Sequence, residues 1–207
     1  MQIYKDMNVG TAKIKKEDMK EIPHHMIDIV SPKERFSVSS YKKMAEECIE
    51  KILKEGHVPI IVGGTGLYID ALIYEIEFED QNIDETFREN LNKKAEEEGL
   101  SVLYEMAKKI DPVAMEKISE NDKKRIIRVL EIYEKTGCTK TEQEINSRKS
   151  DTKYDYKLFG VTLERAELYE RINKRVDEMV ENGLIDEVRN ILKKYESPKT
   201  AMQGIRV

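Results

Sequence analysis

A glycine-rich turn is the clearest candidate for ligand chemistry in this sequence. Residues 63–66 read Gly-Gly-Thr-Gly, between an apolar run at 58–62 and a segment at 67–74 with helical character. Glycines let backbone N–H groups approach a ligand closely, and a helix N-terminus favours anions. Thr65 can hold a substrate group there, and it can equally cap the helix of a tight structural turn. The turn lacks the Lys-Ser/Thr ending of a Walker A loop.

A cluster of cations near the middle of the chain is a second candidate site. Lys124, Arg125 and Arg128 fall in the segment 122–136, whose apolar residues repeat with helical spacing. Such cations can seat the phosphates of an RNA. From the segment alone, a solvated face with Glu131 as an ion-pair partner is the favoured interpretation.

Two arginines further along the chain form a third candidate site. Arg171 and Arg175 are four residues apart, so they lie one turn apart on the helix predicted there. Arginine forks suit the oxygens of a diphosphate. Neighbouring glutamates, including Glu167, also offer ordinary ion pairs, so the spacing alone does not decide the role.

Histidines and cysteines do not indicate a metal site. His24 and His25 are adjacent and point to opposite sides of an extended chain, and His57 is the one other histidine. Cys48 and Cys138 are distant from each other and form no ligand pattern. We therefore expect reduced thiols in a cytoplasmic protein.

Helical segments must position most of these side chains. Apolar residues recur in them at intervals of three and four, and Gly56 follows the first where a helix C-cap favours positive φ. The predicted helices span 40–55, 67–74, 84–98, 100–109, 112–119, 122–136, 141–148, 166–181 and 184–195.

Three segments have the composition of strands: the second half of 22–30, the run 58–62, and 156–163. The run 58–62 is apolar on both faces, as buried strands of parallel sheets are. A helix, a buried strand, a glycine turn and a helix in succession indicate an α/β fold. Residues 84–150 contain no strand pattern, which predicts a helical subdomain inserted into that core.

Composition limits the possible classes. A chain of 207 residues with 39% hydrophobic and 37% charged residues is long enough for one domain with an inserted subdomain. Its apolar runs are far shorter than the roughly 20 residues that span a bilayer. The net charge of −5 does not indicate a nucleic-acid binder, although binding depends on local patches rather than on the sum.

Seven blocks of the sequence, taken together, resemble the tRNA dimethylallyltransferase (isopentenyltransferase) family. Each block alone is weak, but they follow the family's order and cover nearly the whole chain. The blocks are 1–13 (MQIYKDMNVGTAK), 22–28 (IPHHMID), 62–68 (VGGTGLY), 121–131 (NDKKRIIRVLE), 171–177 (RINKRVD), 183–188 (GLIDEV) and 201–205 (AMQGI).

The resemblance implies an α/β fold with an incomplete, P-loop-NTPase-like parallel sheet core and an all-helical insertion subdomain. Residues 1–80 and 155–207 would form the core, and residues 81–154 would bind the anticodon stem-loop of a tRNA. The implied reaction transfers a dimethylallyl group from dimethylallyl diphosphate to N6 of an adenosine beside the anticodon, with Mg²⁺ on the diphosphate. We expect a cytoplasmic monomer with no membrane partner.

The resemblance also implies roles for individual residues. Thr65 and Arg175 are expected in catalysis, and Arg171 and Arg175 at the substrate diphosphate. The residues expected to contact tRNA are Met1, Gln2, Arg88, Lys124, Arg125, Arg128, Gln203, Gly204 and Ile205.

Departures from the family pattern limit the expected activity. The family's phosphate loop and its general-base aspartate, two residues before the position of Met1, are not in this sequence. We therefore expect the 207-residue chain alone to be inactive in prenyl transfer. Alternatives are an enzyme prenylating free adenine nucleotides, which would not need the helical block at 84–150, a non-catalytic RNA-binding remnant, and a small-molecule kinase with the same core.

Overall fold

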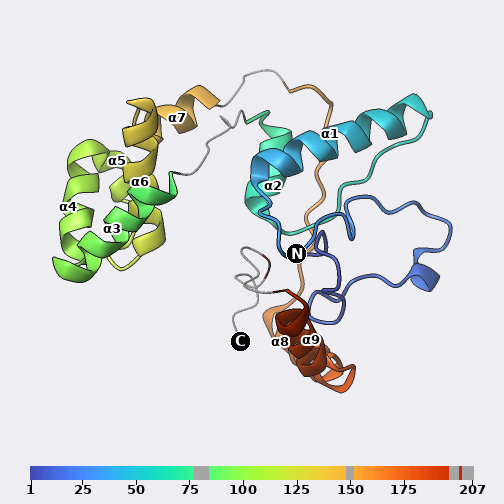
Figure 1. The fold of residues 1–207 in the computed structure, drawn as a ribbon. Helices are drawn as coiled ribbons and strands as arrows, with labels where there is room; N and C mark the ends of the chain where they lie inside the picture. Colours follow the sequence, from blue (N-terminus) through green and yellow to red (C-terminus); the bar gives the residue numbers. More distant parts are fainter. Residues whose placement is uncertain (77–83, 148–151, 196–200, 202–207) are drawn as a thin grey trace. The chain divides into compact units, whose positions relative to one another are not determined.

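Two compact units make up the chain. The computed structural model describes residues 1–76, 84–147, 152–195 and 201. One unit combines Met1–Tyr68 with Tyr156–Val207, and the other is Ile69–Asp155. Figure 1 follows the chain through both units. Each unit has a buried apolar cluster of its own.

Helices dominate the described residues, and their positions agree closely with the predicted segments. None of the helices in those residues is long and apolar enough to cross a membrane. The helices are η1 (Lys16–Met19), α1 (Val38–Lys54), α2 (Gly66–Ile73), α3 (Glu85–Glu97), α4 (Leu100–Ile110), α5 (Pro112–Met115), α6 (Lys123–Thr136), α7 (Lys140–Ser147), α8 (Arg165–Glu181) and α9 (Leu184–Lys194).

Short polar side chains decide where several helices begin. Asp84, Asp111 and Asp122 accept hydrogen bonds from backbone N–H groups in the first turns of α3, α5 and α6. Gly137 ends α6 with a φ of +70°, a backbone conformation that residues other than glycine rarely adopt. Helix α5 ends at Met115, earlier than the predicted 119.

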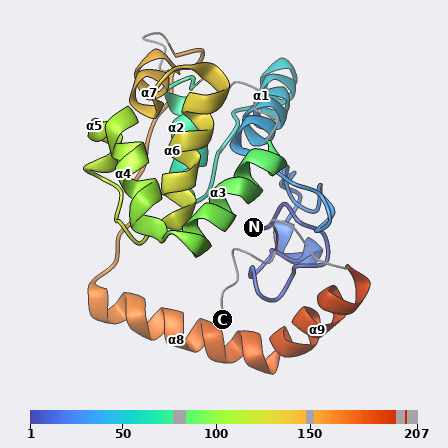
Figure 2. The same ribbon diagram turned by 60° about the vertical axis from the view of Figure 1, so that its left-hand side comes forward.

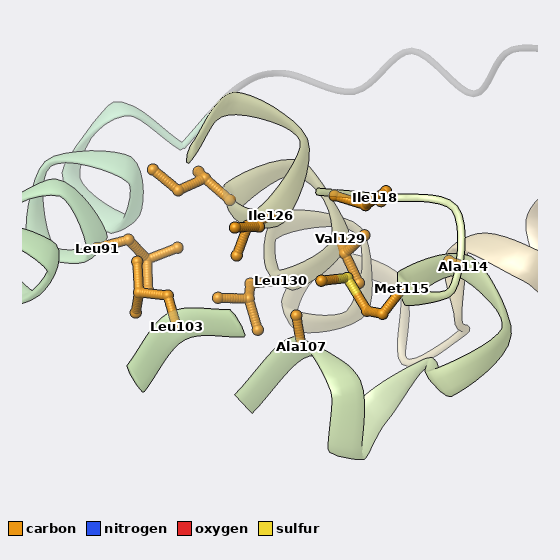
Figure 3. Packing of buried hydrophobic residues seen from close by; sticks show 10 residues of the cluster. Leu91, Leu103, Ala107, Ala114, Met115, Ile118, Ile126, Val129 and Leu130 are labelled. Carbon is orange, nitrogen blue, oxygen red and sulfur yellow. The ribbon is translucent and has the colours of Figure 1, made fainter. Parts of the chain in front are cut away.

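The core of the unit 69–155 is helix packed on helix. Helix α4 packs against α3, α5 and α6, and Figure 3 shows their apolar side chains meeting between the helices. Leu103 and Ala107 of α4 are fully buried, as are Ile126 and Val129 of α6. These positions repeat at three and four residues, so each helix presents one apolar stripe to its neighbours.

A buried carboxylate joins α5 to α7 in this unit. Asp111 accepts the Thr141 hydroxyl at 2.7 Å and the Thr141 backbone N–H at 2.8 Å, as well as the Ala114 N–H at 2.9 Å. Burial by itself raises the pKa of Asp111, but these hydrogen bonds and nearby Lys140 outweigh it and hold the pKa below its ordinary value. The ionised form of Asp111 therefore stabilises the fold.

The other unit packs residues near the N-terminus and residues of the α9 region into one core. Ile3, Tyr4 and Met7 near the N-terminus pack in one buried cluster with Ile191 of α9 and with Tyr195. An isolated parallel bridge joins Tyr4 to Val30, with the Lys5 N–H donating to the Val30 carbonyl at 2.9 Å and the Val30 N–H donating to the Ile3 carbonyl at 3.0 Å.

The three predicted strands are not seen in the described residues, which contain no strand beyond that single bridge. The segments 58–62 and 156–163 form no ladder, and the side chains of Val58 and Val62 are 84% and 89% exposed. An extended segment becomes a strand only when a neighbouring strand accepts and donates its backbone hydrogen bonds. Strand composition was present, but no such neighbour lies beside these segments in the described part of the chain.

We predict that Leu103→Ala destabilises the unit 69–155 by about 2–5 kcal/mol, because it leaves a cavity at a fully buried position. Urea denaturation followed by circular dichroism measures the change. Ile145→Ala is the control, because Ile145 on α7 is exposed and its loss should change stability by less than about 0.5 kcal/mol. Equal effects of the two substitutions would contradict the described packing.

Asp111→Asn should lower stability at neutral pH by about 1–3 kcal/mol, because the amide cannot accept all three hydrogen bonds. The pKa of Asp111 is lower in the folded chain, so its contribution is full above the unfolded value of about 3.9 and is lost as the pH falls through the folded value. The difference between the two proteins should therefore shrink in acid. Denaturant titrations at several pH values measure it, and a constant difference would contradict the assignment.

Candidate functional site

The glycine turn leads directly into α2, as the sequence predicts. The Thr65 carbonyl accepts the Tyr68 N–H at 2.9 Å, which closes the turn, and the Thr65 side chain is exposed. The Tyr68 ring stacks on the Tyr41 ring of α1, with centroids 4.4 Å apart and planes 22° apart. Burial raises the pKa of both tyrosines, so both rings stay neutral. The stack therefore fixes the start of α2 against α1.

The glycines of this turn have room around them. A Cβ at Gly63, Gly64 or Gly66 would meet nothing within 4 Å, and none of the three has a φ in the left-handed region. Neither crowding nor backbone conformation in the described residues therefore requires glycine here. The backbone of the turn is open to close approach by a ligand.

Arg171 and Arg175 lie one turn apart on α8, and both are exposed. Figure 2 shows α8 as a long helix that leads into α9. Arg171 donates to Glu167 at 2.7 Å, the ordinary i,i+4 ion pair that the sequence left open. No hydrogen bond or ion pair of the described residues joins either arginine to Thr65, so the structure does not assemble these three side chains by direct contact.

In the unit 69–155, two predicted tRNA-binding arginines share one carboxylate. Arg88 of α3 donates to Glu131 of α6 through Nε at 2.5 Å and Nη2 at 2.8 Å, and Arg128 Nη1 lies 3.5 Å from the same carboxylate. The hydrogen bond and charge of Glu131 raise the pKa of Arg88. The Glu131 side chain is 8% exposed, whereas Arg88 and Arg128 are 37% and 41% exposed. Glu131 is thus a buried anion that holds two half-exposed cations.

Lys124 and Arg125 lie on the exposed side of the first turn of α6. Arg125 Nε is 3.3 Å from Asp122, the residue that caps this helix. The ion pair is exposed and costs little to open. These two cations and Arg128 therefore come from consecutive turns of one helix, as the sequence predicts.

Gln2 lies half-buried in the other unit, against the loop at 8–12, and Met1 beside it is exposed. The Gln2 Nε2 donates to the carbonyls of Thr11 at 3.1 Å and Ala12 at 3.2 Å. The side-chain amide of Gln2 is therefore held by the loop. The predicted tRNA-contacting residues Gln203, Gly204 and Ile205 lie outside the described residues.

Glu187 of α9 is a residue whose part in this region the sequence did not predict. Its carboxylate accepts the backbone N–H groups of residues 8–10, at 2.7, 2.7 and 3.0 Å. Asp6, in the same loop region, accepts the Tyr195 hydroxyl at 2.5 Å and Lys194 Nζ at 2.6 Å. A hollow of about 370 Å³ lies between this loop and α9, lined by Asp6, Asn8, Glu187, Asn190, Ile191 and Lys194.

Known proteins closely resemble this chain in sequence. The family model described as IPP transferase matches residues 2–207. A tRNA dimethylallyltransferase of Caldanaerobacter subterraneus is 49% identical over 208 residues, and one of Carboxydothermus hydrogenoformans is 46% identical over 205 residues. Each alignment covers 99% of this chain and 66% of the relative, so the chain spans just under two thirds of the length of these relatives.

Solved structures agree with the sequence comparisons. The tRNA isopentenylpyrophosphate transferase of Bacillus halodurans is 39% identical with a TM-score of 0.62, over 98% of this chain and 62% of that one. A eukaryotic dimethylallyltransferase acting on tRNA is 30% identical with a TM-score of 0.75, over 96% of this chain and 49% of that one. With a family model that spans nearly every residue and relatives close to 50% identical, the chain belongs to the IPP transferase family.

Proposed function

We propose that this protein transfers a dimethylallyl group from dimethylallyl diphosphate to the N6 amine of a tRNA adenosine beside the anticodon. Membership of the IPP transferase family carries the proposal, because close relatives are tRNA dimethylallyltransferases. The match covers 66% of those relatives, so the activity of a whole protein is inferred from this shared portion.

The chemistry of the reaction assigns tasks to the predicted residues. The adenine amine is a weak nucleophile, so a general base must take its proton as the N–C bond forms and the allylic C–O bond breaks. The leaving diphosphate carries away the electron pair and needs positive charge. Arg171 and Arg175 supply exposed guanidinium groups for it. We assign the alignment of a substrate group to Thr65, because it lies in a glycine turn with open space around its glycines.

The arginine and lysine residues on α3 and α6 support the binding of an anticodon stem-loop. Arg88 uses Nε and Nη2 for Glu131, so Nη1 remains as a donor for a phosphate. Because Glu131 holds the guanidinium of Arg88 in place, little conformational entropy is lost on binding. Lys124 and Arg125 extend the same charge along α6. A helical unit with its own core favours a tRNA substrate over a free nucleotide, which needs no such unit.

Magnesium is part of the reaction that the family resemblance implies, and the described residues do not by themselves identify where it would bind. In that part of the chain, no group of three or more histidine, cysteine, aspartate and glutamate side chains is placed to hold a metal ion. Oxygen ligands from carboxylates are what Mg²⁺ takes from a protein. We therefore assign no step of the reaction to a metal held by these residues.

The sheet core is also part of the proposal. The apolar segments 58–62 and 156–163 form no regular secondary structure and are mostly exposed. Their composition favours strands of a parallel sheet. A cytoplasmic monomer is the state that we expect for such an enzyme.

We predict that the chain binds an anticodon stem-loop RNA with an affinity that falls steeply as salt rises, because lysines and arginines displace counterions from phosphates. Replacing Arg125 with Gln should weaken binding and reduce the slope of log affinity against log salt by about 1. Fluorescence anisotropy with a labelled stem-loop measures both quantities.

Lys93→Gln is the matched control for that experiment. It removes one exposed cation from α3 of the same unit, where Lys93 pairs with Glu97 of its own helix. Its salt slope should equal that of the unchanged chain. If the slopes of log affinity against log salt were equal for the Arg125 and Lys93 variants, Arg125 of α6 would not contact the RNA, which would contradict the proposed RNA surface.

Arg175→Gln should weaken binding of dimethylallyl diphosphate about tenfold or more, because a charge-assisted bond to the diphosphate is lost. Lys174→Gln is the control, since Lys174 is an exposed neighbour on α8 that pairs with Glu178. Isothermal titration calorimetry compares the two variants with the unchanged chain. A loss of the same size in both would show a general charge effect rather than a diphosphate site at Arg175.

A further inference from the structure

Glu187 joins two segments that are far apart in the sequence. It lies in the first turn of α9, and both of its carboxylate oxygens accept backbone N–H groups from residues 8–10. Hydrogen bonds to an ionised acceptor are about twice as strong as neutral ones. Among the described residues, Asp186, its neighbour in the same turn, pairs only with Arg189 of the same helix. The contact with the loop is therefore specific to Glu187.

Further hydrogen bonds within the loop at 8–12 connect the residues held by Glu187 to Thr11 and Ala12. The Thr11 hydroxyl donates to the Met7 carbonyl at 2.6 Å. The Ala12 N–H donates to the Val9 carbonyl at 2.9 Å, although Ala12 has a φ of +44°, which alanine rarely adopts. A backbone held in such a conformation needs restraints on both sides. Glu187 supplies restraints at residues 8–10.

The far end of the loop decides how the Gln2 amide is turned. Carbonyl oxygens only accept hydrogen bonds, so the end of the amide that faces Thr11 and Ala12 must be the NH₂ group. Gln2 Oε1 then points away from these two carbonyls as an acceptor. No donor reaches it from the described residues.

We propose that Glu187 is a positioning residue for base recognition: through the loop at 8–12 it holds Gln2 so that Oε1 accepts a hydrogen bond from the exocyclic amine of the target adenine. This inference rests on the proposed function and on the expectation, from the family resemblance, that Gln2 contacts the tRNA. If the base carries a carbonyl in place of that amine, its oxygen faces Gln2 Oε1. Both oxygens are acceptors, so no hydrogen bond forms and the base binds less well. Glu187 itself touches no substrate.

The test compares binding of two labelled anticodon stem-loops, with adenosine or inosine at the target position. Inosine has a carbonyl in place of the 6-amino group and a hydrogen on N1. The unchanged chain should prefer the adenosine loop about tenfold, the discrimination expected from one well-placed hydrogen bond to a base. Glu187→Gln places an NH₂ group against backbone N–H groups of the loop and so weakens the contact. The ratio of affinities for the adenosine and inosine loops should therefore fall toward one. Asp186→Asn, the matched control, should keep it.

Two further measurements separate positioning from a general loss of structure. Hydrogen exchange at the amides of residues 8–10 should become faster in Glu187→Gln and stay unchanged in Asp186→Asn. In a double-mutant cycle, Glu187→Gln should cause no additional loss of preference once Gln2 is alanine, because Glu187 acts through Gln2. Thr11→Val loosens the loop without touching α9 and should lower the preference as well, even if the Glu187 variant fails to fold.

Each remaining outcome counts against a stated claim. Faster exchange with an unchanged preference for adenosine would overturn the positioning role and leave the proposed function standing. Salt-sensitive binding of both loops without preference in the unchanged chain would also overturn it, while RNA binding remained. Failure of the unchanged chain to bind either loop would overturn the proposed function and this inference together.

Discussion

The buried carboxylate of Glu131 is the interaction on which the helical unit 69–155 depends. A charge that is 8% exposed must be paired, because an unpaired buried ion costs several kcal/mol. Arg88 and Arg128 pair with it from α3 and α6, so the need to neutralise one anion sets the relative position of two helices. The same pairing leaves both guanidinium groups partly exposed at the surface. The proposed binding of phosphates therefore falls on side chains that also pair within the fold.

Carboxylates also organise the other unit, where no sheet holds the described segments together. Glu187 accepts three backbone N–H groups of the loop at 8–10, and Asp6 accepts both Tyr195 and Lys194. The hydrogen bonds with Lys194 and Tyr195 hold the pKa of Asp6 below its ordinary value. These contacts surround an apolar cluster that contains Ile3, Met7 and Ile191. Polar bonds thus fix the register between the N-terminal loop and α9, while apolar burial supplies the less directional attraction.

Local sequence was sufficient to find the helices and insufficient to find a sheet. Helices satisfy their backbone hydrogen bonds within one segment, so apolar spacing and caps such as Asp84 and Asp122 locate them. A strand needs a partner from elsewhere in the chain, and the run at 58–62 has the composition of a strand without forming one in the described residues. The glycine turn before α2 was predicted, because its residues are contiguous.

The sequence by itself determined the helical segments, the identity of the family and the residue types at the candidate sites, since contiguous motifs carry all three. Only the tertiary structure decided which side chains meet. Glu131 was predicted as a partner of the cations on α6, but its stronger bond to Arg88 comes from a helix 43 residues away. The hydrogen bonds from residues 8–10 to Glu187 cross 177 to 179 residues. No local pattern encodes such pairs, because they form only after separate apolar faces have packed and brought distant backbone and side-chain groups within hydrogen-bonding distance.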